Sequence, residues 1–120
     1  YFIYYYDDNL LIFSTQTSAG TANELGGSFS LKDNKWHHLV ATYGNGAMKI
    51  FADSKLIAQQ ARTGNLLTGG QLTVGNYFNG SMDELRIYDQ ALSSAQIEQN
   101  FAQGIYKKQL AELTSNSLLK

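Results

Sequence analysis

The chain has 120 residues, of which 43% are hydrophobic and 16% charged, and this composition fits one small globular domain and excludes a disordered tail. The formal net charge is -1 and no long basic run occurs, so nucleic acid is not expected as a partner. Cysteine is absent, which excludes disulfides and thiolate metal sites.

The chain opens with two β-rich runs, residues 2–6 and 9–14, and the Asp7-Asp8 pair between them predicts a hairpin. Residues 16–23 are rich in threonine, serine, alanine and glycine, so we predict a surface loop there. A short strand is expected at residues 29–31, before the next turn.

Residues 1–6 are apolar, but the run is too short to span a bilayer and lacks the features of a signal peptide. We therefore predict no membrane insertion within the chain. Tyr1 resembles the middle of a strand, so we expect an upstream region or another chain to complete the sheets.

The strongest predicted strand is residues 36–43, which leads into Asn45-Gly46, the best short hairpin signal in the chain. Residues 48–52 alternate polar and apolar side chains, and Asp53-Ser54 form a turn before the return at residues 56–58. This pattern predicts a second hairpin, near a sheet edge.

Two further strands are predicted at residues 71–75 and 81–88, the second after another Asn-Gly pair at 79–80. Turn signals recur about every 8–12 residues, which is typical of a β-sandwich or barrel. We predict that four apolar side chains lie between two stacked sheets: Trp36, Val40, Leu85 and Ile87.

The sequence period changes after residue 90. Residues 93–96 have the form of a capping box, which predicts a helix that begins at Ser94. Apolar side chains then recur at spacings of four on one helical face, at Ile97, Phe101 and Ile105. Gly104 is expected to end or bend this helix, with residues 106–113 as a second helical stretch.

Two segments carry a family resemblance. The first is residues 36–44 with residues 48–56, where a tryptophan and two histidines precede an apolar strand and a hairpin. The second is residues 72–93, in which a last strand leads into a small helix. Together they resemble the laminin G-like domains of the concanavalin A-like lectin/glucanase superfamily. Ser54 departs from that pattern, because the family usually has glycine at this turn.

The resemblance implies an all-β fold, an antiparallel β-sandwich of the jelly-roll type with a short C-terminal α-helix. Residues 1–91 are then the C-terminal portion of the jelly roll, with its N-terminal strands missing, and residues 92–120 form the helical segment. The resemblance also implies a module that binds carbohydrate or protein ligands and has no catalytic activity.

Asp83 is the candidate metal ligand. It lies beside Leu85 and Ile87 on the apolar face of the predicted last strand, and a carboxylate there needs a partner. The resemblance makes calcium one such partner, assisted by carbonyl groups near residues 76–79. Structural hydrogen bonding by Asp83 is the alternative.

The sequence gives no catalytic constellation. Glycosidases need two carboxyl groups at a defined separation, and the chain lacks the Glu-Asp-Glu run of the glucanase relatives. No serine lies in a nucleophile elbow. His37 and His38 are adjacent on a predicted strand and point to opposite faces, so they cannot chelate one ion, and we interpret both as structural or surface residues.

Sugar binding needs aromatic faces for stacking and amide groups for hydroxyls. The tyrosines of residues 4–6 and the loop at residues 76–79 supply both. The predicted ligand-binding residues are Tyr4, Tyr6, Asn76, Tyr77 and Asn79. The alternative is that the tyrosines only pack across the sheet with their hydroxyl groups at its rim.

Two functions remain open. The chain is either an extracellular or cell-surface adhesion module for a glycan or a protein, or a structural head domain of a surface assembly such as a pilus, fibre or filament. The tail at residues 105–113 mixes apolar and basic side chains and favours self-association in such an assembly.

Overall fold

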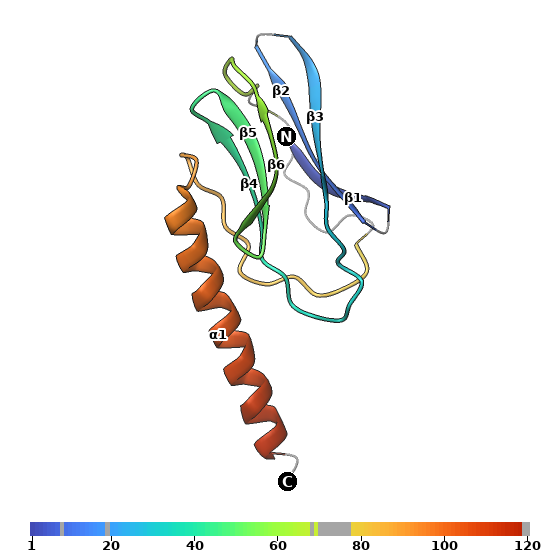
Figure 1. The fold of residues 1–120 in the computed structure, drawn as a ribbon, viewed down its shortest axis with the longest axis vertical. Helices are drawn as coiled ribbons and strands as arrows, with labels where there is room; N and C mark the ends of the chain where they lie inside the picture. Colours follow the sequence, from blue (N-terminus) through green and yellow to red (C-terminus); the bar gives the residue numbers. More distant parts are fainter. Residues whose placement is uncertain (8, 19, 68, 70–77, 119–120) are drawn as a thin grey trace.

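In the described part of the chain, six antiparallel β-strands form two three-stranded sheets that face each other, and one long helix follows them (Figure 1). The computed structural model describes residues 1–7, 9–18, 20–67, 69 and 78–118. The mostly-β class, the sandwich arrangement and the C-terminal helix agree with the prediction from the sequence.

The first sheet has the order β1-β2-β3, with β1 at Phe2–Asp7, β2 at Leu10–Thr17 and β3 at Gly20–Ser28. The predicted hairpin of β1 and β2 is confirmed, with a bulge between Tyr5 and Asp7. β2 pairs along its length with β3.

The predicted loop at residues 16–23 is wrong, because β2 continues to Thr17 and β3 begins at Gly20. Thr17, a β-branched residue within this range, is buried, as is Thr15 just before it. The short strand expected at residues 29–31 is also wrong, since these residues follow the end of β3 as coil.

The second sheet has the order β4-β5-β6, with β4 at Leu39–Gly44, β5 at Ala47–Ala52 and β6 at Lys55–Ala61. Both predicted hairpins are confirmed. Asn45 and Gly46 have φ angles of 52° and 75°, the left-handed pair that a tight type I′ turn requires. Asp53 and Ser54 adopt the same conformation with φ angles of 49° and 67°.

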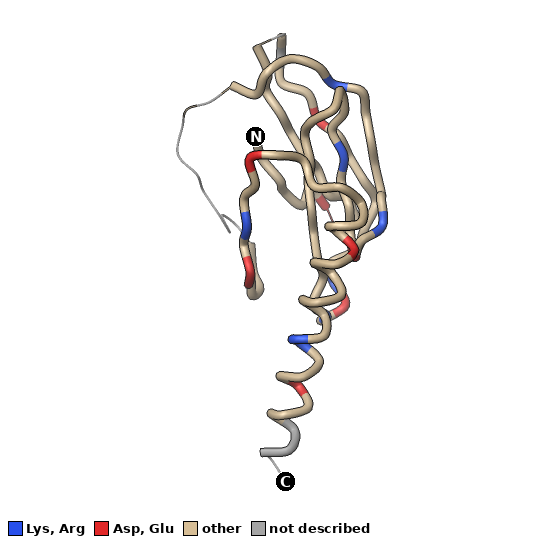
Figure 2. The backbone as a smooth tube through the Cα atoms, turned by 90° about the vertical axis from the view of Figure 1, so that its left-hand side faces the viewer, with Lys and Arg blue, Asp and Glu red and all other residues tan. Residues whose placement is uncertain are grey.

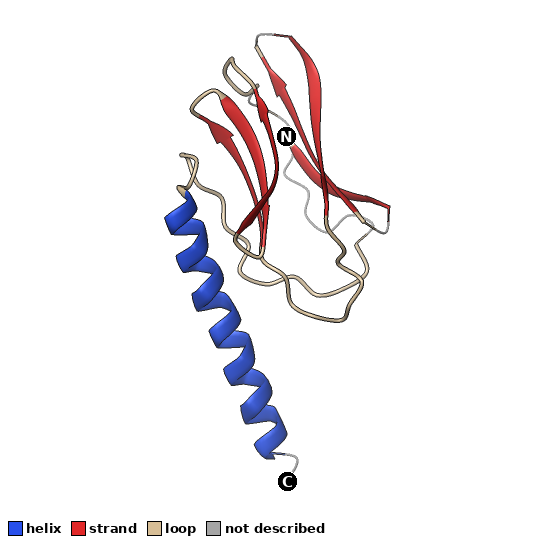
Figure 3. Cartoon of the chain, viewed as in Figure 1, coloured by secondary structure: helices blue, strands red, loops and turns tan. Residues whose placement is uncertain are grey.

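The core lies between the sheets, where β3 faces β5 and β6 (Figure 3). Its buried cluster consists of Phe13, Leu25, Met48 and Ile50. The sheets approach closely at Gly27, where a Cβ atom would lie 2.8 Å from Cδ1 of Ile57. A Cβ atom here would require the Ile57 side chain or the neighbouring strands to shift.

The last predicted strand, residues 81–88, is wrong: the segment is irregular. Glu84 has a φ angle of 54°, which is incompatible with an extended strand, and no strand of the described residues pairs with the segment. Leu85 is 63% exposed and Ile87 58%, so neither belongs to the core. The predicted strand at residues 71–75 lies outside the described residues.

Trp36 was also predicted in the core and is instead 37% exposed, because β4 begins only at Leu39. Val40, the fourth predicted core residue, is half-buried. The backbone before β4 is held differently, by Asp53 of the β5–β6 turn. The Asp53 amide donates to the carbonyl of His38 at 2.8 Å, and the His38 amide donates to Oδ1 of Asp53 at 2.9 Å.

Helix α1 spans Ser94–Leu118, and its predicted start at Ser94 is confirmed. The capping box forms as expected: the amide of Ser93 donates to Oε1 of Gln96 at 2.9 Å, and the amide of Gln96 donates to Oγ of Ser93 at 3.3 Å. The expected end or bend at Gly104 is wrong, and the helix is longer than predicted. A mid-helix glycine costs only about 1 kcal/mol, which the helix-forming residues on either side offset.

The second half of α1 extends past the sheets, and the molecule measures 58 × 30 × 26 Å (Figure 3). No helix among the described residues is long and apolar enough to cross a membrane.

Candidate functional site

The first candidate site is the aromatic outer face of the first sheet. Among the described strands, β1 lies at the edge of its sheet, and its register places Phe2 and Tyr4 on the face that points away from β4–β6. Phe2 is 71% exposed, and Tyr6, at the β1 bulge, is 70% exposed. The edge therefore presents aromatic rings to solvent instead of the charged side chains that often protect such strands.

Tyr4 holds a carboxylate on this face. Its hydroxyl donates a 2.8 Å hydrogen bond to Oε1 of Glu24, which lies on β3, two strands away. The Tyr4 side chain therefore crosses β2, where Ile12 is buried. The hydrogen bond to Glu24 raises the pKa of Tyr4, so the phenol keeps its proton and fixes the carboxylate.

The other predicted ligand-binding residues are not joined to this face. Asn76 and Tyr77 lie outside the described residues. Asn79 is exposed, and within the described part of the chain no hydrogen bond links it to Tyr4 or Tyr6. Glu24 was not predicted as a site residue because it follows the predicted loop at residues 16–23. The run Asn23-Glu24-Leu25 has no strict polar/apolar alternation, so no local signal predicts a strand there.

A second candidate site is a groove of about 280 Å³ between α1 and the sandwich. Its walls come from the stretch before β4, from the segment at residues 83–84 and from one face of α1. The main lining side chains are Trp36, His37, His38, Asp83, Phe101 and Lys108.

Cations of α1 cover one side of this groove. The Lys108 ammonium lies 3.8 Å from the centroid of the Trp36 ring, and it also pairs with Oδ2 of Asp83. Lys107 Nζ is 3.7 Å from Oε1 of Glu84. Figure 2 shows acidic and basic residues in close succession on the segment that supplies Asp83 and Glu84. These contacts attach the middle of α1 to the sandwich.

Asp83, the predicted calcium ligand, is already paired with a cation of α1. The hydrogen bond from Lys108 lowers the pKa of Asp83, so its carboxylate is ionised but already paired with an ammonium group. Within the described residues, no three or more His, Cys, Asp and Glu side chains are grouped so as to hold a metal. Calcium binding at Asp83 stays a prediction, and it requires displacement of Lys108.

The two adjacent histidines point in different directions, as predicted for neighbours on extended backbone. The His37 ring lies between two carboxylates, with Nδ1 2.8 Å from Asp53 and Nε2 2.8 Å from Asp33. The His38 ring faces Phe101 of α1, with ring centroids 6.1 Å apart. Burial lowers the pKa of His38, so its ring is neutral near pH 7.

The aromatic face and the sandwich around it can now be compared with known proteins. The sequence profile of a laminin G-like family, described as the concanavalin A-like lectin/glucanases superfamily, matches residues 1–98. The chain belongs to this superfamily. A comparison with curated proteins gives no match.

Among solved structures, this chain is similar to the crystal structure of an S-layer domain-containing protein from Clostridium thermocellum, with 17% sequence identity and a TM-score of 0.47. The match covers 77% of this chain. The chain spans about half the length of that structure, 51%.

Proposed function

We propose that the chain is a non-catalytic recognition module that binds glycans outside the cell or at its surface through the aromatic outer face of the first sheet. The observation that carries the proposal is the carboxylate of Glu24, held by Tyr4 beside the exposed rings of Phe2 and Tyr6. Aromatic faces stack on the C–H faces of sugars, and a fixed carboxylate accepts hydrogen bonds from hydroxyl groups. Membership in a lectin-containing superfamily supports it.

The spacing of carboxylates on this face supports binding without hydrolysis. Asp7 is paired with Leu10 of β2, whereas Glu24 is paired with Ser14. Four residues of strand separate these positions, which is about 13 Å. Glycosidases hold their two carboxyl groups about 5–9.5 Å apart, so Asp7 and Glu24 are too far apart to act together on one glycosidic bond.

A glycan array followed by titration calorimetry on the whole chain tests the proposal. We expect a saturable ligand whose affinity falls about tenfold in a Tyr6→Ala variant, which corresponds to the loss of about 1.4 kcal/mol. Tyr106→Ala is the matched control, because Tyr106 is an exposed tyrosine on α1. Equal affinities for the two variants, or no ligand on the array, would reject this glycan site. The chain could then act in recognition only by binding an extracellular protein.

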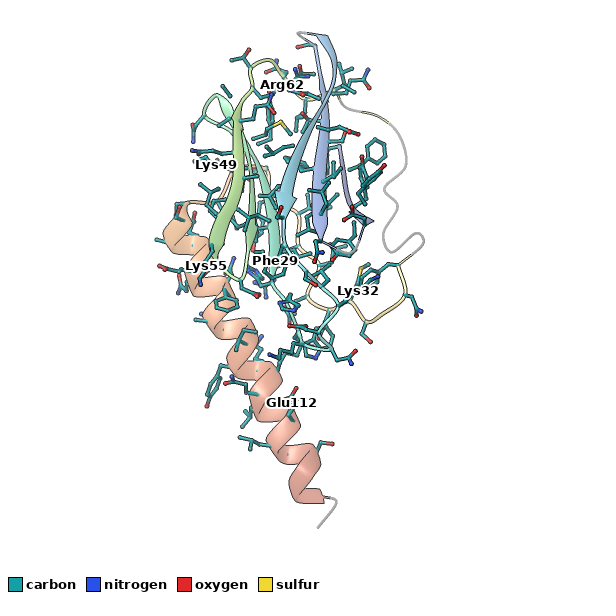
Figure 4. All side chains as sticks on the ribbon, turned by 45° about the vertical axis from the view of Figure 1, so that its right-hand side comes forward. Phe29, Lys32, Lys49, Lys55, Arg62 and Glu112 are labelled. Atoms are coloured by element: carbon teal, nitrogen blue, oxygen red, sulfur yellow. The ribbon has the colours of Figure 1, made fainter. Side chains whose placement is uncertain are left out.

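A second candidate function is that of a head domain in a surface assembly, where α1 makes contacts between copies of the chain. Tyr106, Leu110 and Leu113 are exposed at spacings of four and three on α1. They lie on the face opposite Ile97, which is fully buried. Figure 4 shows Glu112 on the part of α1 that extends beyond the sheets.

Sedimentation over a range of protein concentrations tests this second function. We expect self-association in the natural chain and its loss in a Leu110→Glu variant, because a charge would enter an apolar contact between helices. Gln109→Glu adds the same charge next to the stripe and serves as the control. A monomer at every concentration would remove this function.

A further inference from the structure

His37 lies at the joint between two parts of the molecule, the β3–β4 connection and the β5–β6 turn. Its side chain is 12% exposed, and its ring packs edge-on against Phe29, with centroids 5.1 Å apart. Asp33, four residues earlier, belongs to the connection that crosses from β3 to β4. Asp53 belongs to the β5–β6 turn. The ring therefore bridges this connection and the second sheet.

The two contacts of His37 require a positive charge on the ring. Each ring nitrogen is 2.8 Å from a carboxylate oxygen, and an ionised carboxylate can only accept a hydrogen bond. A neutral imidazole has one N–H group and can donate to one carboxylate, which leaves the other nitrogen lone pair facing an anion. Only the imidazolium donates to Asp33 and Asp53 together.

The residues on either side of His37 are those that meet α1. Trp36 lies under the Lys108 ammonium, and His38 faces Phe101. Any shift of the backbone at His37 moves both contacts. Asp33 is the weaker of the two anchors of His37: its side chain is 40% exposed, whereas Asp53 is also held by the backbone of His38.

We propose that His37 is a proton-operated latch: its imidazolium fastens the β3–β4 connection to the β5–β6 turn and thereby fixes the surface on which α1 docks. Loss of the proton releases Asp33 first, and Trp36 then moves relative to Lys108. The latch goes beyond the glycan-binding function and stands without it, because it involves no residue of the aromatic outer face.

The charges around His37 agree with this behaviour. Burial disfavours the charged ring, but the hydrogen bonds to Asp53 and Asp33 outweigh it and raise the pKa of His37 above the ordinary value of about 6.5. On the connection, Asp33 also accepts from the amide of Lys35. Across the groove stand Asp83 and Glu84, each paired with a lysine of α1, Lys108 and Lys107.

The sign of the pH dependence follows from both partners. Because the folded state raises the pKa of His37, the latch contributes its full stability below about pH 6.5 and loses it as the pH rises through the folded-state pKa. The hydrogen bond to His37 lowers the pKa of Asp33, so the contribution is also lost as the pH falls through that lower pKa. The latch is therefore strongest between about pH 4 and pH 6.5.

The test uses the whole chain and two probes. Trp36 is the only tryptophan, so intrinsic fluorescence reports the docking surface directly. An NMR titration of the two imidazole rings should show His37 losing its proton at higher pH than His38, and the Trp36 emission should shift to longer wavelength together with the His37 signal. A His37→Gln variant should show no such shift.

An Asp33→Asn variant removes one carboxylate while its amide oxygen still accepts a hydrogen bond. It should move the His37 titration to lower pH, whereas Asp89→Asn, which changes an exposed aspartate, should leave it in place. The latch is overturned if His37 in the natural chain titrates at or below the ordinary histidine value, if Trp36 emission is constant across that titration, or if the two aspartate variants behave alike.

Discussion

β5 and the segment at residues 81–88 both carry apolar side chains next to an Asn-Gly pair, but only β5 forms a strand. β5 is the middle strand of its sheet, with β4 and β6 paired on its two sides. Its Met48 is fully buried. In the segment, Met82 is half exposed, and no described strand pairs with it.

This difference shows that an apolar run becomes a strand only when neighbouring strands form hydrogen bonds with its backbone and other residues cover its side chains. Backbone N–H and C=O groups need hydrogen-bond partners. For a middle strand, the neighbouring strands on its two sides supply these partners at each residue. Residues 81–88 lack this support within the described chain, and salt bridges from Lys108 to Asp83 and from Lys107 to Glu84, the latter at 3.7 Å, hold the segment to α1. An exposed ion pair of this kind contributes little.

The largest effect should separate the two regions through the two methionines of the chain. Met48→Ala removes a fully buried side chain between the sheets and should lower the free energy of unfolding by about 2–5 kcal/mol. Met82→Ala makes the same chemical change in the exposed segment and should cost less than about 0.5 kcal/mol. Urea unfolding with an unchanged m-value measures both. Similar midpoints for the two variants would contradict the assignment of the core.

A smaller effect is expected from added volume. Gly27→Ala places a methyl group against Ile57 in the packed region and should destabilise by about 1–3 kcal/mol. Gly80→Ala, before the exposed segment, meets only the ring of Phe78, which can turn away. Its cost in the same urea experiment should be smaller. If Gly27→Ala is neutral, either the Ile57 side chain moves aside without cost or β3 and β6 do not approach as closely as described.

Features that depend on neighbours in sequence could be predicted. The Asn45-Gly46 turn follows from backbone preferences of two residues, and the capping box of Ser93 and Gln96 follows from a spacing of three. Their formation needs little from the rest of the chain. The family pattern in residues 36–56 contains both strand runs and turns and indicated the correct superfamily.

Features that depend on distant residues were not predicted. Glu24 meets Tyr4 only because β1 and β3 flank β2, and Asp33 meets His37 beside Asp53 only because the connection folds against a turn. No local pattern encodes these distances. The exposed Leu85 and Ile87 leave apolar surface uncovered in the described structure, and completion of the sheets by an upstream region or another chain stays a prediction.

Calcium binding at Asp83 would change the contact between the exposed segment and α1. If Asp83 is a ligand, Ca²⁺ must compete with Lys108, so a Lys108→Met variant should gain more thermal stability from calcium than the natural chain. With the affinity typical of extracellular calcium sites, about 1 mM Ca²⁺ would stabilise that variant by roughly 0.4–1.4 kcal/mol. Differential scanning calorimetry with and without chelator measures the shift. An unchanged midpoint in the Lys108→Met variant would reject Asp83 as a calcium ligand, and Lys107→Met, which leaves Asp83 paired, is the control.

The smallest effect should come from a turn in the packed region. Ser54 has a φ angle of 67°, where a side chain with a Cβ atom is strained by about 1–2 kcal/mol relative to the ordinary conformation. Glycine has no such strain but loses more chain entropy on folding, by about 0.5–1 kcal/mol, so Ser54→Gly should stabilise the protein by about 0.5 kcal/mol. Ser28→Gly, at the end of β3, should instead destabilise it. A higher urea midpoint for Ser54→Gly would show that strand pairing of β5 with β6, and not the turn sequence, holds these turn residues in the left-handed conformation. A lower midpoint would mean that the serine hydroxyl makes a contact that outweighs the strain.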